Sequence, residues 1–215
     1  MNDALRLALS RAAIYRVLAT AFAYPHRGHA DDIARAAAAA LRGAPATVRS
    51  TLAELARRLD AHEADALTEQ YVALFDRQVA CPRADIARYA AFGMMASGRR
   101  LDADDHIGAE LEFMGALVLK EAWARAHRNI DHAALARDAQ RAFLEEHLGR
   151  WGDAFAARVL DAAPAGLYGT AARLLRLWLL AECARLVVAP NPLEGRMASE
   201  EAPFTCPMAE TPATP

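Results

Sequence analysis

The strongest constraint on this chain is its helix-forming composition. Its 215 residues include 54 alanines and 26 leucines, against 13 valines and isoleucines together. Alanine and leucine favour helices, whereas β-branched residues favour strands, so this composition predicts an all-α fold. A chain of this length normally forms one domain, and it buries enough apolar surface to fold without metals or disulfides.

Apolar residues recur at helical spacing along most of the chain. Leu67, Tyr71 and Leu74, for example, lie at i, i+4 and i+7. The pattern, punctuated by prolines and glycines, predicts helices at 3–23, 31–43, 46–59, 64–76, 84–96, 106–127, 131–147, 152–162 and 166–188. The sequence therefore predicts a single multi-helix bundle domain over residues 1–189.

The composition changes after this region. Six prolines fall within the last 26 residues, separated by acidic and small residues. Such a segment cannot bury enough apolar surface to order itself, so residues 190–215 are predicted to form a flexible, disordered tail.

The charge balance excludes several classes of function. The chain carries 25 basic and 27 acidic residues, a net charge of −2. This balance argues against a nucleic-acid binder and against a polybasic membrane-surface protein. Arg11 and Arg16 interrupt the N-terminal apolar stretch, and further charges interrupt 171–188, so neither a signal peptide nor a membrane span is expected. Three widely separated cysteines give no disulfide framework, which indicates a reducing compartment.

No motif for catalysis, a cofactor or a metal stands out. The chain has no Glu-x-x-His, His-Glu-x-x-His, Cys-x-x-Cys or Gly-x-Ser-x-Gly. The glycines Gly93 and Gly98 have phosphate-loop spacing but lack the Lys-Ser/Thr pair, so they are interpreted as a helix end. The pair His26 and His29 could bind a metal, but a solvated turn is the favoured interpretation. We therefore expect no catalytic residue, no cofactor and no metal.

The segment from Asp104 to Met114 concentrates ionisable side chains at the start of a predicted helix. Asp105 is well placed to cap this helix, and His106 and Glu110 share one face. Two glycines and an alanine lie on the face of Glu112, which would let another helix approach and leave Glu112 partly buried. The alternative interpretation is helix capping together with a structural buried carboxylate.

These residues also resemble a known family. Asp105-His106-Ile107, followed by Glu110-Leu111-Glu112-Phe113-Met114, resembles the signature of the TorD/DmsD/NarJ family of chaperones that mature DMSO-reductase-type molybdoenzymes. The stretch 69–75 is similar to the family's Tyr-x-x-Leu-Phe helix. Diffuse agreement extends over about residues 5–189. One departure is that the segment after Cys81-Pro82 is shorter than usual by about a loop.

The resemblance implies an all-helical, cytoplasmic binding protein rather than an enzyme. Family members bind the N-terminal signal peptide, often of twin-arginine type, or the body of the apo catalytic subunit until the molybdopterin cofactor is inserted. Carboxylates beside an apolar groove would suit such a peptide, because charge-assisted bonds to arginine are strong and directional. The predicted client-binding residues are Asp104, Asp105, His106, Glu110, Glu112, Glu69, Tyr71, Phe75 and Tyr89. For the aromatic residues, core packing is the alternative.

Two other functions remain open from the sequence. One is a non-catalytic helical assembly subunit of a redox complex, which would handle no signal peptide. The other is a ligand-regulated helical bundle with a small-molecule pocket near Trp123 or Trp178. The sequence allows a monomer or a homodimer, and no nucleic-acid partner is expected.

Overall fold

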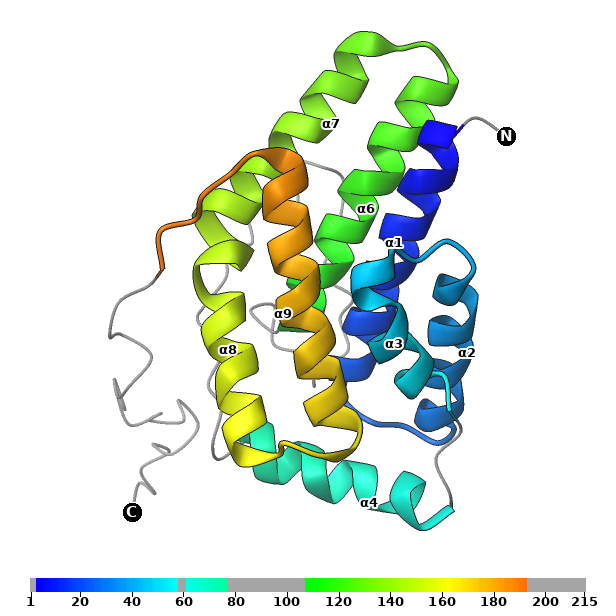
Figure 1. Cartoon of the computed structure of the whole chain (residues 1–215), viewed down its shortest axis with the longest axis vertical. Coiled ribbons are helices and arrows are strands. Elements are labelled where there is room, and N and C mark those ends of the chain that lie inside the picture. Colours follow the sequence, from blue (N-terminus) through cyan, green and yellow to red (C-terminus); the bar gives the residue numbers. More distant parts are fainter. Residues whose placement is uncertain (1–2, 58–60, 77–106, 193–215) are drawn as a thin grey trace, which may run out of the picture.

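The computed structural model describes residues 3–57, 61–76 and 107–192, and within these ranges the chain is all-α (Figure 1). The prediction of an all-α helix bundle is confirmed. The elements are α1 (Asp3–Phe22), α2 (His29–Leu41), α3 (Ala46–Leu55), α4 (Ala61–Tyr71), η1 (Val72–Asp76), α6 (Ile107–Ala126), α7 (Ile130–Phe143), η2 (Leu144–Leu148), α8 (Gly149–Ala162) and α9 (Gly166–Leu186). None of these helices is both long and apolar enough to cross a membrane.

The helices α1 and α6 form the central antiparallel pair of the bundle, and they pack side by side along most of their length. Helix α7 packs on α6, α8 packs on α9, and α2 and α3 cover α1 and α9 on one side. Helix α4 lies across one end of the bundle (Figure 1). The close approach of α1 and α6 depends on Gly115, because a Cβ there would lie 3.3 Å from Cβ of Tyr15.

The helix ends mostly follow the sequence signals. Helix α1 ends before Tyr24-Pro25 as predicted, since proline cannot continue a helix. Helix α2 begins earlier than predicted, at His29, after Gly28 in a left-handed conformation with φ 83°. The N-cap of α7 is Asn129, whose side-chain oxygen accepts a 3.0 Å hydrogen bond from the backbone N–H of His132. Asp131 therefore lies in the first turn of α7 and does not cap it.

Two π-helical segments, η1 and η2, interrupt the predicted continuous helices. Such insertions recur at functional sites in proteins. The segment η2 is followed by Gly149, where a Cβ would overlap the carbonyl oxygen of Leu144 and would lie 2.5 Å from Cγ of Pro190. Glycine is therefore required at this junction, and its lack of a side chain admits the segment that follows α9.

The chain after α9 packs back onto the bundle. The backbone turns at Val187, a β-branched residue in a left-handed conformation with φ 55°. Arg141 donates hydrogen bonds to the carbonyl oxygens of Leu186 and Val187, and Arg150 donates to that of Asn191 at 3.0 Å. The described chain is thus held to the bundle as far as Asn191, and residues 193–215 of the predicted tail lie outside the described residues.

Candidate functional site

The first family-like motif lies on α4 and η1, across one end of the bundle (Figure 1). Its tyrosine, Tyr71, is only 5% exposed, and Phe75 is half-buried. Their rings contact each other with centroids 4.7 Å apart. Glu69, on the same helix, is exposed. The motif therefore turns its aromatic side chains inward and its carboxylate toward solvent.

The motif's aromatic rings are anchored in the core. Phe75 stacks on Phe155 of α8 with centroids 5.9 Å apart, and it meets Phe22 of α1 edge-on at 6.2 Å. Tyr71 meets Tyr24 edge-on at 5.2 Å. Such edge and offset arrangements stabilise aromatic pairs beyond the area that they bury. These contacts fix η1 against α1 and α8.

The second motif begins α6. Glu110, in its first turn, is only 2% exposed, and Nε1 of Trp151 donates a 3.2 Å hydrogen bond to its Oε2. Trp151 in turn meets Phe155 edge-on at 5.5 Å. Since Phe155 also stacks on Phe75, the two motifs are joined through one face of α8. We call Glu110, Trp151, Phe155, Phe75 and Tyr71 the motif cluster.

The prediction that Glu112 is partly buried is wrong. Glu112 is exposed, and Glu110 occupies the buried position instead. The glycine-based approach of α1 does occur at Gly115, but it leaves Glu112 exposed. Glu112 thus lies on the solvent face of α6 and leads, along that face, to the exposed Trp123.

The other predicted site residues differ in what the structure describes. Asp104, Asp105, His106 and Tyr89 lie outside the described residues, as do Cys81 and the Gly93–Gly98 segment. Among the described residues, α6 runs from Ile107. The structure brings Tyr71, Phe75 and Glu110 together through α8, while Glu69 and Glu112 are exposed on α4 and α6.

The sequence analysis missed a buried polar cluster in the middle of the bundle. Arg11 of α1 donates to Glu182 of α9 at 2.6 and 2.9 Å and to Oε1 of Gln140 at 2.7 Å. Gln140 also donates to Glu121 of α6 at 2.9 Å. The hydroxyl of Tyr15 donates to Glu182 at 3.1 Å. These five residues, the polar cluster, are each at most 5% exposed and join α1, α6, α7 and α9.

Burial sets the ionisation of this cluster. Burial, together with the charge of Glu182, raises the pKa of Tyr15 well above its usual value, so the hydroxyl stays protonated and able to donate. Burial alone would lower the pKa of Arg11, but its hydrogen bond and ion pair with Glu182 outweigh this effect and raise it. The sequence signal was present, because Arg11 and Glu182 fall at core-facing positions of otherwise apolar helices.

The loop that precedes α2 differs from the solvated turn that the sequence predicted. His26 is exposed, but His29 is only 2% exposed, and neither of its ring nitrogens has a hydrogen-bond partner. The two rings meet edge-on with centroids 5.0 Å apart. Among the described residues, no group of three or more His, Cys, Asp or Glu side chains is arranged to hold a metal.

Comparison with known proteins finds a family model that matches part of the chain. The family model described as "Nitrate reductase delta subunit" matches residues 86–157, about one third of the chain. The matched region contains α6, α7 and η2 and the part of α8 that carries Trp151 and Phe155. Neither the curated proteins nor the solved structures gave a significant match. The match includes the motif of residues 105–114 and supports its resemblance to the TorD/DmsD/NarJ family of molybdoenzyme maturation chaperones, whereas the stretch 69–75 lies outside the matched residues.

Proposed function

We propose that this protein is a cytoplasmic chaperone that binds the signal peptide, the apo form, or both, of a DMSO-reductase-type molybdoenzyme subunit. It would hold that subunit until the cofactor is inserted, before export or assembly. The observation that carries the proposal is the family match over α6–α8, which includes the carboxylate motif and the helix that joins it to the aromatic motif.

The proposed binding surface surrounds the start of α6. Asp104, Asp105, His106 and Tyr89 are proposed to contact the client, and the exposed carboxylates of Glu112 and Glu69 to attract the arginine pair of its signal peptide. Glu110 has a different role in this proposal. Because it is buried against Trp151, it positions the first turn of α6. Tyr71 and Phe75 likewise hold η1 in place.

The test is capture of the client by this chain after co-expression with a candidate apo subunit. Asp105→Ala together with His106→Ala should abolish capture. The matched control is Asp131→Ala together with His132→Ala, since this exposed Asp-His pair also lies at a helix start, on α7. The control should capture the client as the wild type does. Circular dichroism should show that all three proteins are folded.

A peptide-binding experiment distinguishes a signal-peptide-binding chaperone from a helical assembly subunit that handles no signal peptide. A synthetic signal peptide with an Arg-Arg pair should bind at least about tenfold more tightly than its Lys-Lys version, because only arginine forms bidentate bonds to carboxylates. Equal binding of the two peptides would indicate nonspecific apolar contact. If folded wild type captures neither subunit nor peptide, the result would favour the alternative, a helical assembly subunit of a redox complex.

A further inference from the structure

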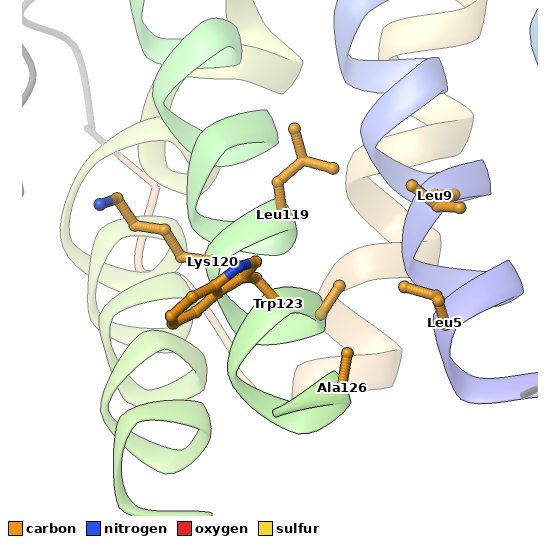
Figure 2. A pocket seen from close by; sticks show the side chains of 7 residues that line it. Leu5, Leu9, Leu119, Lys120, Trp123 and Ala126 are labelled. Atoms are coloured by element: carbon orange, nitrogen blue, oxygen red, sulfur yellow. The ribbon is translucent and has the colours of Figure 1, made fainter. Parts of the chain in front are cut away.

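A second surface lies at the opposite end of the α1–α6 pair. There the two helices flank a hollow of about 610 Å³, which Figure 2 shows from close by. Leu5 and Leu9 of α1 face Leu119 and Ala126 of α6 across it, and Trp123 lies beside them. The lining residues are Leu5, Leu9, Leu119, Lys120, Ala122, Trp123 and Ala126, and we call them the cationic groove. The small side chains of Ala122 and Ala126 leave the hollow open, and the leucines and Trp123 form its border.

The apolar side chains of the cationic groove are unusually open to water. Leu9 is 43% exposed, Leu119 is 46% exposed and Trp123 is 60% exposed. The Trp123 ring is nevertheless held in place, because the ring of His127 lies against it with centroids 4.2 Å apart. Nδ1 of His127 is itself 2.8 Å from the carbonyl oxygen of Trp123. Concave apolar surfaces with positioned aromatic side chains are typical of binding sites.

The charged side chain that lines the cationic groove is positive. Lys120 is exposed there, and Arg128 is exposed just beyond the end of α6. Arg125 is paired with Glu121, which is buried in the polar cluster. Lys120 forms no ion pair with any described residue, so its ammonium group is available to a carboxylate from outside the chain.

We propose that the cationic groove docks an amphipathic helix of a partner protein whose apolar face is bordered by aspartate or glutamate. A third helix fits the groove between two packed helices, with apolar residues at i, i+3, i+4 and i+7 entering the hollow. Its carboxylates would pair with Lys120. The hollow is concave, which suits a helix better than a flat bilayer.

This site is distinct from the surface proposed for the signal peptide. Glu112 lies 11 positions before Trp123 on the same face of α6, which is about 16 Å along the helix. A twin-arginine peptide is cationic, so the positive rim of the cationic groove would repel it. The inference therefore does not depend on the client, and it can fail without affecting the proposed function.

Tryptophan fluorescence provides a direct readout of binding. Of the three tryptophans, Trp151 and Trp178 are each 2% exposed, and only Trp123 faces the cationic groove. The probe is a helical peptide of about 14 residues with leucines at i, i+3, i+4 and i+7 and flanking glutamates. Its titration should shift the emission of the wild type to shorter wavelength. The same shift should be absent in Trp123→Phe, which shows that the signal comes from this side chain.

Two substitutions with matched controls test the two parts of the proposal. Lys120→Glu should weaken binding of the acidic peptide at least about tenfold, whereas Arg42→Glu, an exposed charge reversal at the C-cap of α2, should not. Leu119→Ser should also weaken binding, whereas Leu180→Ser, at an exposed leucine of α9, should not. All four side chains are exposed, so the variants should fold.

Four results would overturn the proposal. The first is the absence of binding, and the second is equal binding of a peptide in which lysines replace the glutamates. The third is a Trp123 emission shift with vesicles of phosphatidylcholine and phosphatidylglycerol but not with the peptide, which would assign the surface to a membrane. The fourth is self-association of the chain that Leu119→Ser abolishes, which would assign it to a second copy.

Discussion

The two ends of the α1–α6 pair differ in what covers them. At one end α4 and η1 lie across the bundle, and Tyr71 and Phe75 pack with Phe22 and Phe155 (Figure 1). At the other end Leu9 and Trp123 remain exposed around an open hollow. The same two helices supply apolar side chains at both ends. Apolar side chains packed beneath α4 and η1 therefore stabilise the fold, whereas the exposed apolar side chains around the hollow are available to a partner.

The two ends also differ in charge. Helix α6 carries the carboxylates of Glu110 and Glu112 near its start, and it carries Lys120 and Arg125 near its end, with Arg128 just beyond it and Glu121 buried. This order suits the helix dipole, which favours anions at the N-terminus and cations at the C-terminus. It also gives one helix two surfaces of opposite character. The first suits a cationic peptide, and the second suits an acidic one.

The comparison predicts very different costs for removing one tryptophan from each end. Trp151→Ala should lower the free energy of unfolding by about 3–5 kcal/mol, because it leaves a cavity and removes the hydrogen-bond donor of buried Glu110. Trp123→Ala should change it by about 0.5 kcal/mol or less, since the side chain is 60% exposed. Urea unfolding followed by circular dichroism measures both. Similar costs would mean that the motif cluster is not part of the core.

The polar cluster lies between the two ends. It allows a buried arginine and an exposed arginine to be compared, because both lie near the carboxylate of Glu121. Arg11 and Arg125 both lie near Glu121, but Arg11 is 4% exposed and Arg125 is exposed. Arg11→Met should cost about 3 kcal/mol, because Glu182 loses its closest cation while buried. Arg125→Met should cost about 0.5 kcal/mol or less. Denaturant midpoints provide the measurement.

A double variant sharpens this prediction. In Arg11→Met with Glu182→Leu the buried carboxylate is removed together with its partner, so a large part of the lost stability should return. If the double variant is no more stable than Arg11→Met alone, the loss comes from packing of the arginine stem and not from an unpaired charge.

Most of the helices could be predicted because the pattern of residues that specifies a helix lies within the helix itself. Alanine and leucine periodicity located the helices, and the ends of α1, α6 and α9 lie within two residues of the prediction. The π segments were not predicted, since they break the 3.6-residue period that the argument used. The inward packing of the Tyr-x-x-Leu-Phe rings follows from their i, i+4 spacing, as the core-packing alternative anticipated.

The site was harder to predict because its partners are distant in sequence. Trp151 lies 41 positions after Glu110, and Glu182 lies 171 positions after Arg11. Glu110 is buried where Glu112 was predicted to be, and this error also comes from contacts between residues that are distant in sequence. Spacing along one helix defines its faces, but the packing of α1 and α8 decides which face is buried. Exposure of Trp123 could not be predicted for the same reason.

The smallest effect expected concerns His29, which follows Tyr24 near the covered end of the bundle. Burial, with a further contribution from His26, lowers the pKa of His29 to about 4, and Asp32 offsets this only in part. The unfolded chain, with a histidine pKa near 6.5, therefore binds more protons than the folded one between these values. Stability should fall by about 2 kcal/mol from pH 7 to pH 5 through this group.

His29→Leu isolates this contribution. The substitution removes two ring nitrogens that have no hydrogen-bond partner, so it should not destabilise the protein at pH 7, and it should reduce the loss of stability toward pH 5. His132→Leu, at an exposed histidine of α7, should leave that pH dependence unchanged. Urea unfolding at both pH values measures the difference. An unchanged pH dependence in His29→Leu would mean that water reaches this ring, and that the covered end of the bundle is more open around α2 than its packing indicates.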